Sequence, residues 1–122
     1  MKILHIDDEP HILNLIKLIL ESEGIEVDIE CNPRSGLRKA INNSYDLILL
    51  DLMMIGLTGF EVAERIRAAN IKTPIMILSA KNQMVDKFKS INVGVDDYMV
   101  KPFEPNELIR RIKMNVEAGK NG

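Results

Sequence analysis

The chain has 122 residues and a formal net charge of −2, and hydrophobic residues make up 46% of it. This length and balance are typical of one globular domain that can bury a core. There is no basic excess, which argues against nucleic-acid binding by the domain itself. The single cysteine excludes an internal disulfide. No apolar run approaches the roughly 18 residues of a membrane helix, and charged residues begin before a signal-peptide core could form. We therefore expect a cytoplasmic protein with no membrane partner.

The first part of the chain predicts two strands with a helix between them. Residues Lys2–Asp7 form a mostly apolar run, which suits a strand. Pro10 fits the first turn of a helix, and Gly24 fits its carboxyl-terminal cap. Residues Glu26–Cys31 alternate charged and apolar side chains, the pattern of a half-exposed edge strand. We expect Cys31 to be a small buried side chain on that strand.

The next strand leads directly into a carboxylate. Asn32 and Pro33 suit the cap and first turn of a second helix, and the branched aliphatic run Leu47–Leu50 follows and ends at Asp51. Such a run is typical of a strand buried on both faces. Open α/β sheets bind ligands at the carboxyl ends of their strands, which favours a reactive Asp51. This stretch alone leaves open a simple strand-ending or helix-capping role.

The rest of the chain continues the alternation of strand and helix. The predicted elements are a helix from Thr58 through Ile66, a strand at Ile75–Leu78, a weaker helix over Met84–Asn92, a strand at Asp97–Val100 and a helix from Pro105 through Val116. Five alternations with short connections predict an α/β fold, a doubly wound parallel sheet with helices on both faces. We expect a domain over residues 1–118 and a frayed tail or linker start at 119–122.

Polar side chains also follow other predicted strands. Asp7 and Asp8 come after the first strand, Ser79 after the fourth and Lys101 after the fifth. Carboxylates that lie close together repel one another unless a cation is present, and hard oxygen ligands favour Mg²⁺. Together with a lysine and a serine they indicate a phosphoryl-transfer site. The sequence contains no glycine-rich phosphate-binding loop, so a nucleotide site is not indicated.

In order and spacing, these motifs resemble the receiver domain of response regulators in bacterial two-component signalling. The matching stretches are Asp7-Asp8-Glu9-Pro10, Leu50-Asp51-Leu52-Met53 with Gly59 eight residues after Asp51, Leu78-Ser79-Ala80 and Asp96-Asp97-Tyr98-Met99-Val100-Lys101-Pro102-Phe103. They span nearly the whole chain. The resemblance implies a flavodoxin-like (βα)₅ fold with five parallel strands in the order 2-1-3-4-5.

The resemblance also implies the roles of the site residues. Asp51 would accept a phosphoryl group from a sensor histidine kinase. Asp7, Asp8, Asp51 and the backbone carbonyl of Met53 would bind Mg²⁺ or Mn²⁺. Lys101 would pair with Asp51 and later with the phosphoryl oxygens.

The same resemblance implies a switch. Ser79 would hydrogen-bond the phosphoryl group, and Tyr98 would change rotamer as Ser79 moves. The Lys101–Pro102 peptide bond would be cis. One departure is Ile55, at a position where the family commonly carries proline, and we expect a more mobile loop there.

Charged residues of alternating sign lie on the predicted fourth helix, fifth strand and fifth helix, namely Lys87, Asp97, Glu107 and Arg111. One interpretation is a salt-bridged surface of little energetic value. The other is that they resemble the pairs through which winged-helix transcriptional regulators dimerise by their receivers. Lys87 would then meet Glu107 of the partner subunit, and Asp97 would meet Arg111 of the partner subunit. The chain would be the receiver half of a DNA-binding protein, with a stand-alone receiver as the alternative.

Two other functions fit parts of the pattern. A phosphatase of the haloacid-dehalogenase type needs a second acid two residues after its nucleophile, where this chain has Met53. A degenerate receiver that only binds partners would lack part of a residue set that is complete here. The sequence therefore predicts a signalling module and not an enzyme. Its own chemistry would be limited to promoting its phosphorylation and slow self-dephosphorylation.

The histidines and methionines have simpler interpretations. His5 lies inside an apolar strand, so we expect a core or edge histidine whose hydrogen bonds are satisfied. We expect His11 to be a solvated surface residue. The methionines on or beside the apolar strands predict core filling. These are Met53, Met54, Met76 and Met99.

Overall fold

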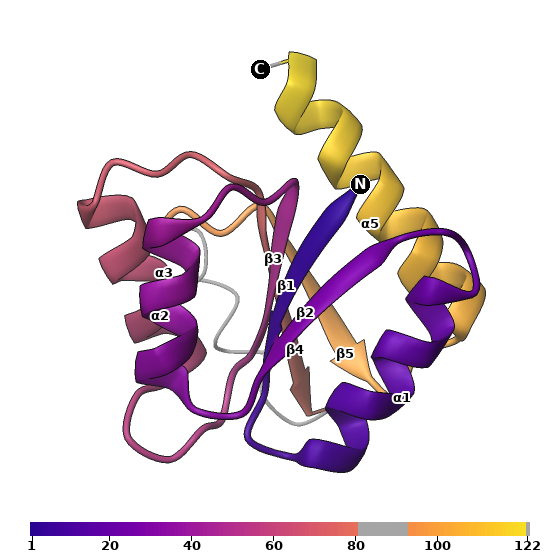
Figure 1. Cartoon of the computed structure of the whole chain (residues 1–122), viewed down its shortest axis with the longest axis horizontal. Coiled ribbons are helices and arrows are strands. Elements are labelled where there is room, and N and C mark those ends of the chain that lie inside the picture. Colours follow the sequence, from indigo (N-terminus) through magenta and orange to yellow (C-terminus); the bar gives the residue numbers. More distant parts are fainter. Residues whose placement is uncertain (81–92, 122) are drawn as a thin grey trace.

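The protein is built around one parallel β-sheet (Figure 1). The computed structural model describes residues 1–80 and 93–121, so the predicted helix over residues 84–92, which includes Lys87, lies outside the described residues. Within them the sheet has five strands in the order β2-β1-β3-β4-β5, as predicted. Their bounds are β1 Lys2–Ile6, β2 Glu26–Glu30, β3 Leu47–Asp51, β4 Ile75–Ala80 and β5 Asp97–Lys101.

Helices cover both faces of the sheet, so the fold is doubly wound, as predicted (Figure 1). In the described part of the chain they are α1 Pro10–Glu21, α2 Pro33–Asn42, α3 Gly59–Ala68 and α5 Pro105–Asn121. Helices α2 and α3 lie on one face, and α1 and α5 lie on the other. None of the described helices is long and apolar enough to cross a membrane.

Strand β3 is the centre of the sheet and is buried along its whole length. Its side chains alternate between the two helix layers, as the pleat of a strand requires. Ile48 and Leu50 pack into the core under α2 and α3, whereas Leu47 and Leu49 pack into the core under α1 and α5. Burial of each such side chain contributes about 1.5–3 kcal/mol. A one-residue slip of β3 would exchange the two sets and turn Asp51 to the other face.

Side-chain caps fix the starts of α2 and α3. The side chain of Asn32 accepts hydrogen bonds from the backbone N–H groups of Arg34 and Ser35 at the start of α2. Thr58 and Glu61 form a reciprocal capping box at the start of α3. Both caps satisfy N–H groups that the first turn of a helix leaves unpaired, which fixes the point where each helix begins.

Arg67 joins the end of α3 to the start of the last two strands. Its guanidinium donates to the carbonyl oxygens of Ile71, Thr73 and Gly94 at 2.8–3.0 Å and to Asp96 Oδ2 at 3.0 Å. The planar fork of an arginine can hold several acceptors in this way. Because three of the four acceptors are backbone atoms, the sequence carried no signal for this network.

Two sequence predictions, for Cys31 and Met53, are wrong in this structure. Strand β2 ends at Glu30, and Cys31 is exposed beyond it, so Cys31 is not a buried strand residue. The side chain of Met53 is 59% exposed and does not fill the core, in contrast to Met54, Met76 and Met99. Helix α5 extends to Asn121, so residues 119–121 belong to the helix. At Gly119 a Cβ atom would lie 2.6 Å from Pro74, which shows how closely this helix end packs.

Candidate functional site

Three carboxylates meet at the carboxyl ends of β1 and β3. Asp7 and Asp8 follow β1, and Asp51 is the last residue of β3. Because β1 and β3 are neighbours in parallel register, with Ile6 opposite Leu50, both ends reach the same edge of the sheet. One oxygen atom from each carboxylate lies within 4.8 Å of the others. We call these three residues the acidic cluster.

Asp7 is the most deeply buried member of the acidic cluster. Its side chain is 0% exposed, and its Oδ1 accepts a hydrogen bond from the backbone N–H of Glu9 at 3.0 Å. Burial, the largest influence, and the nearby charge of Asp51 both raise the pKa of Asp7, whereas the hydrogen bond from the Glu9 N–H lowers it. The net result is a pKa raised from 3.8 to about 6. The metal-free protein therefore holds this carboxylate charged only at a cost.

Asp8 is half-buried and ties the loop after β3 to the site. Its Oδ2 accepts a hydrogen bond from the backbone N–H of Ile55 at 3.1 Å, while the side chain of Ile55 is 88% exposed. Proline has no N–H and could not make this bond. The departure from the family's usual proline therefore adds a contact between the loop and the acidic cluster.

Lys101 supplies the positive charge of the site. Its Nζ donates to Asp51 Oδ1 at 2.8 Å and lies 3.6 Å from Asp7 Oδ2. Burial acts against the charged lysine, but the hydrogen bond and charge of Asp51 outweigh it and raise the pKa of Lys101. Burial also raises the pKa of Asp51, and Lys101 offsets only part of that effect. One ammonium group cannot neutralise three carboxylates, so the site retains net negative charge.

Ser79 lies on β4, the neighbour of β3 in the sheet, and Tyr98 lies on β5, one strand further from Asp51. Strand β4 carries Ser79, which is 1% exposed, and its register places Leu78 opposite Asp51. Strand β5 carries Tyr98, which is half-buried against the core under α2 and α3. The Lys101–Pro102 peptide bond is cis, as the resemblance implied.

Gly59 allows the helix after the site to approach Asp51. A Cβ atom at this position would lie 2.6 Å from the carbonyl oxygen of Asp51 and 3.1 Å from Cα of Leu52. The N–H of Gly59 also donates to the carbonyl oxygen of Leu52 at 2.8 Å. Contacts this short exclude any side chain without a backbone shift, so glycine is needed here.

The acidic cluster fits a hard divalent cation such as Mg²⁺. All its donors are oxygen atoms, and Mg²⁺ is bound in proteins through one or two carboxylates together with carbonyl oxygens and water. Burial is the main cause that raises the pKa values of Asp7 and Asp51, so a bound cation would stabilise the charged forms of both carboxylates. Met53, the expected carbonyl donor, lies in the loop directly after β3.

The charged residues on β5 and α5 pair within the chain. Arg111 Nε donates to Asp97 Oδ2 at 2.8 Å, and Arg111 also contacts Glu107 at 3.3 Å. Glu107 is further paired with Arg110. Burial raises the pKa of Asp97, but hydrogen bonds from Arg111 and Asn115 outweigh it and hold this pKa below its usual range. The structure thus shows a salt-bridged surface, and Lys87, the fourth residue of the predicted set, lies outside the described residues.

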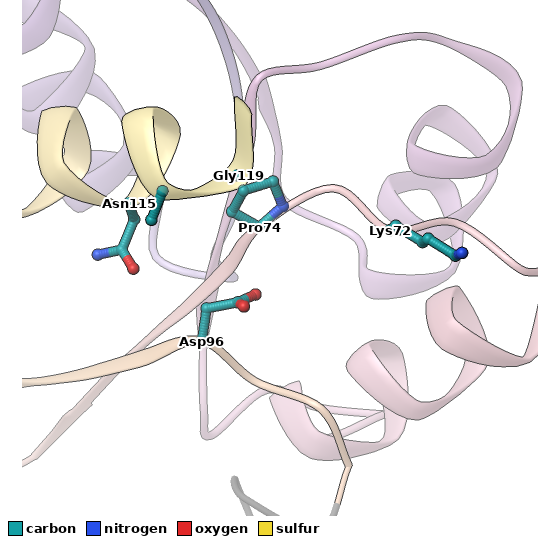
Figure 2. Close-up of a pocket in the computed structure, with 6 residues that line it drawn as sticks. Lys72, Pro74, Asp96, Asn115 and Gly119 are labelled. Carbon is teal, nitrogen blue, oxygen red and sulfur yellow. The ribbon is translucent and has the colours of Figure 1, made fainter. Parts of the chain in front are cut away.

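Several hollows lined by described residues lie away from the acidic cluster. Figure 2 shows one of about 380 Å³ at the amino ends of β4 and β5, opposite to the acidic cluster, where Lys72, Asp96 and Asn115 contribute polar groups. An open hollow of about 390 Å³ lies over β5 and the start of α5, between Tyr98 and Arg111. The second hollow connects the half-buried Tyr98 to the charged surface.

Comparisons with known proteins agree on one family. The family model described as "Response regulator receiver domain" matches residues 3–113. The chain is 47% identical over 112 residues to response regulator ArlR of Staphylococcus saprophyticus, and 43% identical over 112 residues to transcriptional regulatory protein ResD of Bacillus subtilis. These alignments cover 92% of this chain but 50% and 46% of the relatives, so the chain spans about half the length of the relatives it matches.

Solved structures show the same fold. The receiver domain of the Francisella response regulator 1452 superposes with a TM-score of 0.89 at 35% identity, covering 96% of this chain and 97% of that one. A CheY-like receiver domain protein from Methanospirillum hungatei superposes with a TM-score of 0.92 at 30% identity, covering 98% of this chain and 96% of that one. By its motifs, its strand order and these matches, the chain belongs to the response regulator receiver domain family.

Proposed function

We propose that the chain accepts a phosphoryl group on Asp51 from a sensor histidine kinase in the cytoplasm. The observation that carries this proposal is the environment of Asp51. Its carboxylate is buried at the end of the central strand, is hydrogen-bonded to Lys101 at 2.8 Å and lies within the acidic cluster. The residues proposed as nucleophile, counter-charge and metal ligands thus lie close together, in a chain of the receiver family.

In the proposed reaction a carboxylate oxygen of Asp51 attacks the phosphorus atom of a phosphohistidine. A P–O bond forms, the P–N bond breaks, and the leaving imidazole nitrogen keeps the electron pair and becomes protonated. Lys101 can move its hydrogen bond from Asp51 to an oxygen of the transferred group, which offsets the added negative charge. Water later attacks the phosphorus, which returns Asp51 and inorganic phosphate, so the chain catalyses only its own slow dephosphorylation.

The acidic cluster would hold Mg²⁺ or Mn²⁺ during this reaction, together with the backbone carbonyl of Met53. When bound, the ion would supply positive charge that neutralises the phosphoryl oxygens. Asp8 remains accessible at the rim, whereas Asp7 anchors the cluster from below through its hydrogen bond with the N–H of Glu9.

Phosphorylation of Asp51 would be sensed on β4 and β5. Ser79 lies at the end of β4, and Tyr98 lies on the neighbouring strand, where it pairs with Ile77. A phosphoryl group adds charge and strong acceptor oxygens, which favour a hydrogen bond from Ser79. The proposed result is a change of the Tyr98 rotamer and of the surface formed by β5, α5 and the predicted helix over residues 84–92.

The output is proposed to be transcription. The matched relatives have names such as transcriptional regulatory protein ResD and are about twice as long as the matched region. This chain would be the receiver half of such a DNA-binding regulator and would not itself bind nucleic acid, in line with its net charge of −2. A symmetric dimer through β5 and α5 would require Arg111 to exchange its own Asp97 for Asp97 of the partner subunit.

The phosphoacceptor is tested by intact mass after incubation with Mg²⁺ and a small phosphoryl donor such as acetyl phosphate. We expect one labile phosphoryl adduct, absent in Asp51→Asn and absent when Mg²⁺ is removed by a chelator. An adduct that forms on Asp51→Asn, or one stable to alkaline hydroxylamine, would contradict the assignment.

The dimer is tested by sedimentation in the presence of Mg²⁺ and beryllofluoride, a mimic of the phosphoryl group. We expect association that Arg111→Ala weakens and that Arg110→Ala, on the exposed side of the same helix turn, leaves nearly unchanged. A monomer under all conditions would remove the dimer and leave the phosphoacceptor assignment in place.

A further inference from the structure

His5 is a buried polar residue whose role the proposed reaction does not explain. Its side chain is 0% exposed, in the middle of β1. Among the residues that the structure describes, both ring nitrogens of His5 lack a hydrogen-bond partner, and so does Oδ2 of Asp7. The sequence predicted a satisfied core histidine. The position is as predicted, but the hydrogen bonds are not satisfied.

The unpartnered atoms of His5 and Asp7 face each other. The two residues are two positions apart along one chain direction, so their side chains leave the same face of the sheet. His5 Nε2 lies 3.8 Å from Asp7 Oδ2. A shift of about 0.6 Å brings this distance within the roughly 3.2 Å limit of an N–H···O hydrogen bond. A small rotation of either side chain can supply such a shift.

We propose that His5 is a positioning residue for the divalent cation: its Nε2–H donates to Asp7 Oδ2 and holds that carboxylate in its metal-binding orientation. This inference rests on the proposed function, because it assumes that the acidic cluster binds the cation. The chemistry is that of an outer-shell hydrogen bond, which orients a ligand without touching the metal.

The surroundings of His5 favour a neutral donor. The ring is fully buried in the middle of β1, and burying a charged imidazole without a partner is costly. A neutral imidazole carries one N–H, and within the described residues Asp7 Oδ2 is the carboxylate oxygen that the structure places beside Nε2. An aliphatic side chain would fill this apolar position without leaving polar atoms unpaired, so core packing alone does not account for a histidine.

Lys101 makes the donor of His5 more important during the reaction. The ammonium group of Lys101 lies 3.6 Å from Asp7 Oδ2 and 2.8 Å from Asp51 Oδ1. When Lys101 turns toward a phosphoryl group on Asp51, it moves its charge away from Asp7. His5 is fixed within the sheet and stays beside Oδ2, so the orientation of the Asp7 carboxylate does not depend on the phosphorylation state.

The test compares four proteins: wild type, His5→Leu, His5→Gln and His5→Asn. Glutamine places its amide nitrogen near the position of Nε2, whereas asparagine reaches only the position of Nδ1. Mg²⁺ alone is titrated by calorimetry into each protein without a phosphoryl donor. A long-range ¹H–¹⁵N spectrum of the wild-type imidazole is recorded with and without Mg²⁺.

We expect His5→Leu and His5→Asn to weaken Mg²⁺ binding about tenfold, the size typical for loss of an outer-shell partner. His5→Gln should restore most of the affinity, and the wild-type ring should be the Nε2–H tautomer with a signal that moves when Mg²⁺ binds. The role of His5 would be overturned if His5→Leu bound Mg²⁺ as tightly as wild type. It would also be overturned if His5→Gln lost as much affinity as His5→Asn, or if the wild-type ring were the Nδ1–H tautomer. Wild type that binds no Mg²⁺ would overturn the metal site of the proposed function as well, which separates the two failures.

Discussion

Replacing Asp7 by asparagine is expected to stabilise the metal-free protein at neutral pH. In the folded protein the pKa of Asp7 is raised from 3.8 to about 6, mainly by burial. Between these two pH values the folded state binds more protons than the unfolded state, so the stability contributed by this group falls as pH rises. A shift of about 2 units corresponds to about 3 kcal/mol. Because Asp8, beside Asp7 in the acidic cluster, is only half-buried, solvent screening reduces the expected effect to about 2 kcal/mol.

The assay is urea unfolding of wild type and Asp7→Asn in a chelator, from about pH 4 to about pH 7.5. The difference in unfolding free energy should be small at pH 4, where Asp7 is neutral in the folded state and only partly ionised in the unfolded state, and should reach about 2 kcal/mol in favour of Asp7→Asn above pH 6.5. Saturating Mg²⁺ should remove or reverse the difference, because only wild type has the full ligand set. Asp8→Asn is the matched control, with a smaller effect because its carboxylate is half-buried. A difference that does not change with pH would refute the reasoning.

Three further substitutions test the packing and charges around the site. Gly59→Ala places a methyl group 2.6 Å from the carbonyl oxygen of Asp51 and should cost about 2 kcal/mol in urea unfolding and slow adduct formation. Arg67→Met removes four hydrogen bonds and should cost about 2–3 kcal/mol, whereas Arg65→Met, exposed on the same helix, should be nearly neutral; equal effects would contradict the network. Lys101→Met leaves Asp51 buried without its cation. It should lower the free energy of unfolding by about 3 kcal/mol at pH 7 and abolish the phosphoryl adduct. Unchanged stability would show that Asp51 is solvated.

The fold followed from the sequence because its local and global signals agree. Apolar runs such as Leu47–Leu50 are strands buried on both faces, and the alternating run Glu26–Glu30 is the edge strand β2. The caps at Asn32 and Thr58 start helices where the sequence placed them. Each of these signals depends on residues that are close together in the chain, and no distant contact overrides them.

The features that the sequence did not show depend on distant contacts. The end of α5 is helical up to Asn121 because the helix packs on Pro74, which no local signal reports. Cys31 is exposed because β2 stops one residue earlier than the alternation does. The pairing of Arg111 with Asp97 inside the chain could equally have been a pairing between subunits, since charge pattern alone does not say which copy supplies the partner.

The order of the strands in the sheet determines when the site can exist during synthesis. Strand β1 pairs with β3 across 40 intervening residues that include α1, β2 and α2, and Lys101 comes 50 residues after Asp51. Chains are made from the amino terminus, so a growing polypeptide that has passed Asp51 still lacks its cation until β5 has emerged and closed the loop. The Asp51–Lys101 pair therefore forms only after β5 has been made, so a kinase that required this pair, as the proposed reaction suggests, would act only on chains in which β5 has joined the sheet.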